Sequence, residues 1–286
     1  MRKLFIFIVG VFLYIPAVCA YVIDGDVSDW GVDLYGTGAA DKGYLNTHLP
    51  SGGWNIDIVV EDNASSNIYG WQYVGPGYSY GSSDPASDYY KKGNTFDAEA
   101  MYFDNDKDYV YLAVITGLPE DGGKAPHNPL FMPGDIGIDI DGDGVYEFGI
   151  DIDADTDTAK LYHNLDENDW EGVYFDGVNH SPNYSSSSPW RIIEDDSKEV
   201  GDISFVYSSE QNTHYVLEAR IPLDYLGLSA DIGDPVTYLN IHWTMECGND
   251  VLDLKADVNP VPEPASIIMM GLGLLSILGL RVKRRS

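Results

Sequence analysis

The stretch Ile-Gly-Ile-Asp-Ile-Asp-Gly-Asp-Gly-Val-Tyr-Glu-Phe-Gly-Ile-Asp-Ile-Asp, residues 136–153, indicates how the chain folds. Apolar residues alternate with glycine or aspartate in both halves, which is the pattern of β-strands that bury one face. Between the halves, Gly142-Asp143-Gly144 supplies residues that favour a tight turn. The stretch therefore predicts a β-hairpin, with its second strand over residues 145–153.

The rest of the chain repeats this strand-and-turn pattern. Residues 99–103 and 109–115 flank a polar turn, residues 215–221 alternate, and residues 222–227 have the composition of a single helical turn. No segment of the body sustains a helical apolar period, and two stretches, 68–92 and 179–189, have the composition of long surface loops. The sequence therefore predicts an all-β fold, an antiparallel β-sandwich.

The N-terminus has the features of a secretory signal peptide. Met1-Arg2-Lys3 is basic, residues 4–15 are apolar, and residues 17–20 are small, so we expect cleavage after Ala20. Cys19 leaves a lipoprotein alternative open, although Pro16-Ala17-Val18 is a poor lipobox. After cleavage Cys247 is the remaining cysteine, which excludes an internal disulfide. Because Cys247 shares a strand face with apolar residues, we expect a buried, inert thiol.

The C-terminus has three elements in a fixed order. Val261-Pro262-Glu263-Pro264 is extended because each proline fixes its own φ and restricts the preceding residue. Residues 265–280 carry no charge, and Arg281, Lys283, Arg284 and Arg285 follow them. A helix over this run would be about 24 Å long, short of the ~30 Å hydrocarbon core. We therefore expect a short transmembrane helix that holds the chain transiently, with an ordinary tail anchor as the alternative.

This order resembles the PEP-CTERM sorting signal of exported bacterial proteins, and Pro262, Glu263 and Pro264 carry the match. The resemblance implies a Gram-negative bacterium, an exosortase-type processing enzyme and exopolysaccharide production. It also implies an inner-membrane precursor that is cleaved near these prolines and reaches the cell surface or extracellular matrix. The expected domains are a signal peptide at 1–20, a β-sandwich at 21–257 and the sorting signal at 258–286.

The charge of the body limits its partners. The chain has 46 acidic and 16 basic residues. Removing the two basic residues of the signal, and the four basic residues and one acidic residue of the tail, leaves a net charge of −35. Such a body repels nucleic acid and anionic lipid surfaces, so we expect no nucleic-acid partner. The carboxylates need cations, either diffuse or bound.

Three segments of the body resemble family-nine carbohydrate-binding modules and their DOMON-like relatives. They are residues 23–30, with Ile-Asp-Gly and Asp-Trp, residues 106–114, and residues 219–223 followed by Leu226-Gly227. The resemblance implies a β-sandwich, often with structural calcium and sometimes with a sugar site.

The acidic hairpin turn is the candidate metal site. Asp139, Asp141, Asp143 and Gly144 match positions one, three, five and six of an EF-hand-like loop, and Glu147 adds a carboxylate. Position twelve is Ile150 and a strand follows, so the loop is not an EF-hand. A calcium-binding hairpin and a solvated acidic edge that discourages aggregation both remain open. The acidic runs at 104–108 and 151–157 lack the glycine and are weaker candidates.

Aromatic residues offer a second candidate site. Trp54, Trp71 and Tyr73 lie in Tyr- and Gly-rich sequence, and their rings suit sugar stacking, although rings that cover the core edge are the alternative. The six histidines are scattered, and no zinc spacing, nucleophile elbow or P-loop occurs. We therefore expect a non-enzymatic surface or matrix protein, with a carbohydrate-binding module and, less favoured, a glycan-active enzyme as alternatives.

Overall fold

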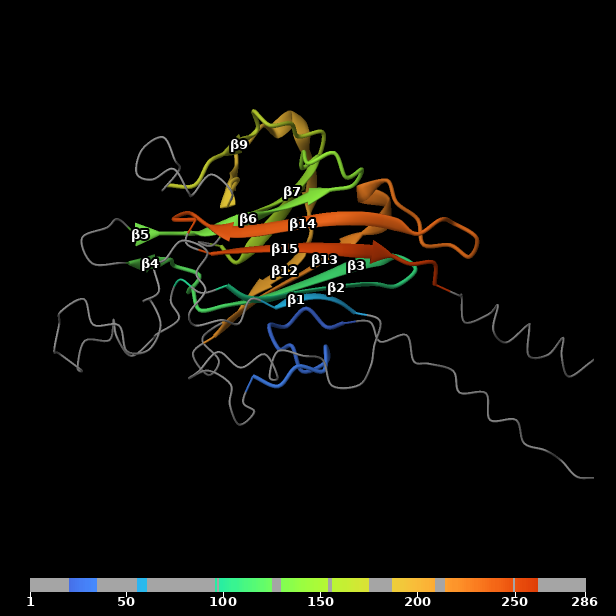
Figure 1. Ribbon diagram of the computed structural model, residues 1–286, viewed down its shortest axis with the longest axis horizontal. Helices are drawn as coiled ribbons and strands as arrows, with labels where there is room; N and C mark the ends of the chain where they lie inside the picture. Colours follow the sequence, from blue (N-terminus) through green and yellow to red (C-terminus); the bar gives the residue numbers. More distant parts are fainter. Residues whose placement is uncertain are drawn as a thin grey trace, which may run out of the picture.

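The structure is a computed structural model that describes residues 21–34, 56–60, 96, 98–124, 130–153, 156–174, 187–208, 214–248 and 250–261. Within these residues the fold is all-β, with two main antiparallel sheets stacked face to face (Figure 1). The predicted signal peptide and sorting helix lie outside the described residues. No helix within the described ranges is long and apolar enough to cross a membrane.

One main sheet has five strands and the other has six. The five-stranded sheet has the order β1 (Asp57–Val60), β2 (Ala98–Asn105), β3 (Tyr109–Thr116), β13 (Tyr215–Pro222) and β12 (Ser204–Tyr207). The six-stranded sheet has the order β11 (Glu199–Asp202), β8 (Thr158–Tyr162), β7 (Phe148–Asp153), β6 (Pro133–Asp139), β14 (Thr237–Met245) and β15 (Val251–Val258). Smaller elements are the pairs β4 (Gly123–Lys124) with β5 (Leu130–Phe131) and β9 (Trp170–Glu171) with β10 (Arg191–Ile192), and the 3-10 turns η3 (Asp196–Lys198) and η4 (Leu223–Leu226).

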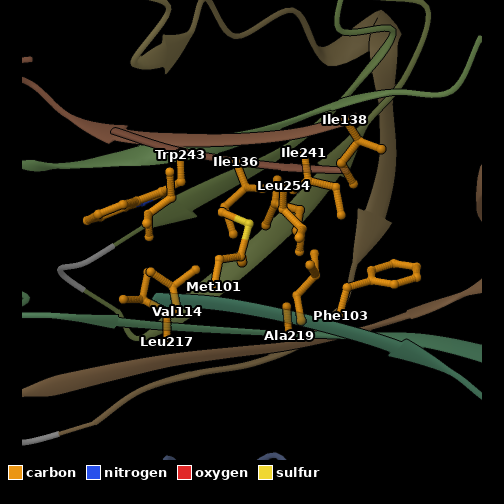
Figure 2. Close-up of a cluster of buried hydrophobic side chains, with 14 of the residues drawn as sticks. Met101, Phe103, Val114, Ile136, Ile138, Leu217, Ala219, Ile241, Trp243 and Leu254 are labelled. Atoms are coloured by element: carbon orange, nitrogen blue, oxygen red, sulfur yellow. The ribbon is translucent and has the colours of Figure 1, made fainter. Parts of the chain in front are cut away.

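The main core fills the space between the two sheets. Figure 2 shows Met101, Leu217 and Ala219 rising from the five-stranded sheet toward Ile136 and Trp243 of the six-stranded sheet. These side chains come from alternate positions of their strands, as a buried strand face requires. Their removal from water contributes roughly 25 cal/mol per Å² of apolar surface, which makes this layer the main source of stability.

The hairpin of residues 136–153 forms as predicted. Ile136 pairs with Ile150, and Ile138 pairs with Phe148. The second strand begins at Phe148 rather than at residue 145, and the ring of Tyr146, in the loop before it, packs over Gly137 on the outer face of the sheet. A Cβ atom at Gly137 would lie 2.8 Å from that ring, so only glycine leaves enough room.

The other predicted elements are also present. β2 and β3 form the hairpin around the polar turn, and η4 is the helical turn after β13. The predicted apolar face of β14 is buried, and Cys247, two residues beyond the end of the strand, is buried beside it. The inert thiol expected from the strand pattern therefore has a structural basis.

A third layer covers the outer face of the five-stranded sheet. The segment 21–34, drawn in blue in Figure 1, packs a second apolar cluster on that face. Tyr21 stacks on Trp30 with ring centroids 3.9 Å apart, and Trp30 is fully buried. The five-stranded sheet is consequently apolar on both faces, and the nearly unbroken apolar run of β3 was a sign of this in the sequence.

Candidate functional site

The loop between β6 and β7 brings together the four acidic residues that the sequence singled out. One carboxylate oxygen from each of Asp139, Asp141, Asp143 and Glu147 lies within 4.8 Å of the others. Asp139 is buried, Glu147 is half-buried, and Asp141 and Asp143 are exposed. This group of oxygens is close enough to hold one metal ion.

The backbone of the loop is shaped by its two glycines. Gly142 and Gly144 have φ angles of 78° and 91°, in the left-handed region that side chains with a Cβ rarely adopt. These turns point backbone N–H groups at the aspartates. The N–H of Asp143 donates to Asp141 Oδ1 at 3.1 Å, and that of Val145 donates to Asp143 Oδ1 at 2.8 Å. Each bond engages one oxygen and orients its carboxylate.

Asp139 is the most firmly held of the four carboxylates. Its Oδ1 accepts from the N–H of Gly142 at 2.6 Å, and its Oδ2 accepts from Gly144 at 3.1 Å and from Asn240 Nδ2 on β14 at 2.9 Å. Burial opposes the charged form, but these hydrogen bonds outweigh it and lower the pKa of Asp139. The carboxylate therefore stays ionised well into acid.

Glu147 closes the loop from the other strand. Its Oε2 accepts from the N–H of Ile140 at 3.0 Å, which fixes it across from Asp139. Burial, and then the charges of Asp139 and Asp141, raise the pKa of Glu147. A carboxylate whose charge is opposed by neighbouring carboxylates is stabilised when a cation joins the group.

The base of the loop is fixed on the outer face of the six-stranded sheet. The ring of Tyr146 packs edge-on against Trp170, with centroids 6.0 Å apart, and lies 5.3 Å from the ring of His242. Burial, and then the charges of Asp253 and Asp139, raise the pKa of Tyr146 to about 12. The phenol is therefore neutral at physiological pH and acts as a packing residue.

The arrangement suits a hard cation. Four carboxylates can each offer an oxygen, and Ca²⁺ prefers six to eight oxygen ligands in flexible geometry. The larger ion also tolerates the irregular spacing of a hairpin loop, whereas Mg²⁺ demands a nearly ideal octahedron.

The two weaker acidic runs have other roles. Asp104 Oδ2 accepts from the hydroxyl of Tyr21 at 2.6 Å, and Asp106 Oδ2 accepts from the hydroxyl of Tyr111 at 2.7 Å. Asp157 Oδ1 accepts from the N–H of Tyr207 at 2.8 Å. Within the described residues, neither run joins a group of ligand atoms like that of the β6–β7 loop.

Sequence reasoning missed a buried carboxylate at the centre of β13. Glu218 Oε2 accepts from the backbone N–H groups of Gly25 at 2.6 Å and Asp24 at 3.1 Å, and Oε1 accepts from Trp30 Nε1 at 2.9 Å. Burial raises the pKa of Glu218 to about 7, against the effect of these hydrogen bonds. Glu218 fastens the segment 21–34 to the sheet. One feature of the sequence could have revealed this burial: Val216, the neighbour of Glu218 on the same outer face, is apolar.

A second missed carboxylate lies at the opposite end of β6 from the acidic loop. Asp135 Oδ1 accepts from the N–H of Ile152 at 2.9 Å, and Oδ2 accepts from that of Ile192 at 2.7 Å, so it joins β10 to the sheet. Burial, and then the charge of Asp151, raise the pKa of Asp135 to about 8. Asp135 and Asp151 border a cavity of about 460 Å³. Its lining also includes Lys160, Trp190, Arg191 and Glu194.

The remaining predicted site residues lie outside the described residues. These are Trp54, Trp71 and Tyr73 of the aromatic site and Pro262, Glu263 and Pro264 of the sorting motif. Sugar binding by the aromatic residues stays a prediction. The described chain ends at Val261, directly before the first of the two prolines.

Comparison with known proteins identifies the C-terminal segment. Residues 260–285 match the family model of the PEP-CTERM protein-sorting motif. The chain carries a PEP-CTERM sorting signal. It is therefore an exported protein, held transiently in the membrane before an exosortase processes it. No curated protein and no solved structure matches the chain, so the resemblance of the body to carbohydrate-binding modules has no support from these comparisons.

Proposed function

We propose that the mature protein is a non-enzymatic, calcium-stabilised β-sandwich that serves at the cell surface or in the extracellular, exopolysaccharide-containing matrix. The observation that carries this proposal is the PEP-CTERM sorting motif at residues 260–285, which marks an exported protein sorted by an exosortase. The body contributes a compact sandwich and an acidic loop suited to a hard cation.

The chemistry of the buried acids supports a structural role. Glu218 and Asp135 have raised pKa values, as catalytic carboxyls often do, but both oxygens of each accept hydrogen bonds, from backbone N–H groups and, at Glu218, also from the indole N–H of Trp30. Each carboxyl ties an added layer to a sheet. These contacts explain why the two carboxyl groups are buried, and the explanation requires no bound substrate.

Processing and destination test the proposal together. The protein is recovered from intact cells, from culture medium and from the polysaccharide matrix, and its termini are measured by mass spectrometry. We expect a chain that begins at Tyr21, lacks Arg281–Arg285 and is enriched in the matrix fraction. A variant with Pro262→Ala and Pro264→Ala should keep its tail and stay with the membrane fraction.

The result that would contradict the matrix role is equally specific. A processed protein found free in the medium, and unchanged in a strain without exopolysaccharide, would separate sorting from matrix association. Turnover of the host polysaccharide that is lost in Asp151→Asn would instead support the glycan-active alternative, because Asp151 borders the polar cavity and burial raises its pKa to about 6.

A further inference from the structure

The point where the chain leaves the sandwich is held firmly to the body. The backbone N–H of Asn259 donates to Asn105 Oδ1 at 2.8 Å, and Asn105 Nδ2 donates to the carbonyl of Asn259 at 2.9 Å. Two residues later, the N–H of Val261 donates to the carbonyl of Ala230 at 2.8 Å. The exit is therefore fixed against the connection between η4 and β14.

Very little chain separates this exit from the apolar run of the sorting signal. Pro262, Glu263 and Pro264 are the intervening residues, so the Cα atoms of Val261 and Ala265 are at most about 14 Å apart. The polar headgroup layer of one leaflet is about 6 Å deep. While the apolar run is in the membrane, the residues around Ala230 must lie in or just above that layer.

The same part of the sandwich carries an excess of exposed apolar side chains. Among the described residues, eight large apolar side chains are exposed, and four of them fall between residues 225 and 238: Tyr225, Ile232, Val236 and Tyr238. In Figure 1 the connection into β14 and the end of β15 lie together at the right-hand end of the sandwich. The pairing of Thr237 with Val258 confirms that they are neighbours.

Ile232 occupies an unusual place within this segment. The N–H of Asp234 donates to the carbonyl of Asp231 at 3.0 Å, which closes a turn, and Gly233 has a φ of 102°. Ile232 is therefore the first of the two central residues of the turn, and 62% of its surface is exposed. Turn positions of this kind usually hold proline, whose ring presets φ, or short polar residues that hydrogen-bond to the nearby backbone.

We infer that this surface, defined by Tyr225, Ile232, Val236 and Tyr238, rests on the lipid headgroup layer while the sorting signal holds the precursor in the membrane. Tyrosine is enriched at membrane interfaces, where its ring is apolar and its hydroxyl is hydrated. The occupant is a bilayer of neutral headgroups, because Asp224, Asp231 and Asp234 lie among the apolar residues and repel anionic lipid.

The tether makes this weak contact effective. A few partly exposed apolar side chains would not hold a free protein on a membrane, but a chain fixed by its own apolar run meets the surface at a high effective concentration. Cleavage at the Pro-Glu-Pro motif removes the tether, and the contact is lost with it. The inference rests on the membrane-held precursor and not on the matrix role of the mature protein.

The test compares two labelled positions in the same chain. The full chain carrying Cys19→Ser is reconstituted into neutral phosphatidylcholine vesicles, with an environment-sensitive fluorophore on Ile232→Cys. The matched control is Ile193→Cys, which is 47% exposed and follows β10, where its N–H donates to the carbonyl of Asp169. Cys247 is buried, so we expect no labelling there in the folded protein.

We expect blue-shifted emission and a several-fold loss of quenching by aqueous iodide at position 232, but not at position 193. Cutting the chain after Val261 should restore full quenching. Equal quenching at both positions in the reconstituted chain would overturn the inference. Shielding that appears only after the processing enzyme is added would also overturn it, and would assign the surface to that enzyme instead.

Discussion

Two acidic regions of this sandwich use the same functional group in opposite ways. At the centre of β13, Glu218 is buried, accepts from three N–H groups and has a raised pKa of about 7. In the β6–β7 loop, Asp139 sits at the rim of the sheet and has a lowered pKa. Both side chains are buried, so the balance between burial and hydrogen bonding makes the difference: four hydrogen bonds outweigh burial at Asp139, whereas burial outweighs three at Glu218.

Removing the buried carboxylate should have the largest effect. Glu218→Ala leaves three N–H donors without their acceptor, so we expect the free energy of unfolding to fall by about 3 kcal/mol or more in urea denaturation. Glu218→Gln keeps one acceptor oxygen and should lose less. Glu167→Ala, at an exposed position, is the control and should stay within about 0.5 kcal/mol. A Glu218→Ala protein as stable as this control would show that the segment 21–34 docks without Glu218.

The second prediction concerns the pH dependence of stability, to which the buried carboxyls contribute. The pKa values of Asp135 and Glu218 are about 8 and about 7 in the folded protein, above the ordinary values of an unfolded chain. The folded state therefore binds more protons between about pH 5 and pH 8, and its stability falls as the pH rises through that window. We expect a loss of about 2.5 kcal/mol from pH 5.5 to pH 6.5, measured in high salt to screen the net charge.

Two variants assign this pH effect to buried groups. Asp135→Asn removes one titrating carboxyl and should make the dependence on pH shallower, even if it lowers stability overall. Asp153→Asn removes an exposed carboxyl of β7 and should leave the slope as it is. If stability falls with pH by the same amount in Asp135→Asn and in Asp153→Asn, surface charge accounts for the whole pH effect.

The smallest effect belongs to the acidic loop. Calcium at ten times its dissociation constant adds about 1.4 kcal/mol to the stability of the folded state, which raises the melting temperature by roughly 3–5 °C. Asp141→Asn should remove this increase, and Asp108→Asn, an exposed acid outside the loop, should keep it. Magnesium at equal concentration measures screening alone. The calcium proposal fails if both ions give the same increase and Asp141→Asn does not change it.

The features that could be predicted from the sequence are those that depend on the pattern of neighbouring residues. The hairpin of residues 136–153 follows from strict alternation, and its glycines fix the turn, so the grouping of Asp139, Asp141, Asp143 and Glu147 could be anticipated. The PEP-CTERM signal was also recognisable, because its three elements are contiguous.

The sequence could not reveal contacts made between distant segments. In β13, Glu218 alternates with inward-facing Leu217 and Ala219, and an acid in that position normally faces water. Its burial depends on the segment 21–34 covering the outer face, and no local rule places that segment there. Asp135 was missed for the same reason, since its partner Ile192 lies on another element.

The bond between Trp30 and Glu218 also has a consequence for the order of events during export. The two residues are 188 positions apart, so Trp30 crosses the membrane long before its acceptor. Until β13 follows, the segment 21–34 can pack only on β1, β2 and β3 and lacks its bonds to Glu218. Tyr21, which is almost fully buried in the finished fold and contacts Asp104 of β2 and Tyr111 of β3, is accessible until those strands have crossed. A signal peptidase that cuts after Ala20 would therefore act during translocation, and the outer layer of the sandwich would be among the last parts to close.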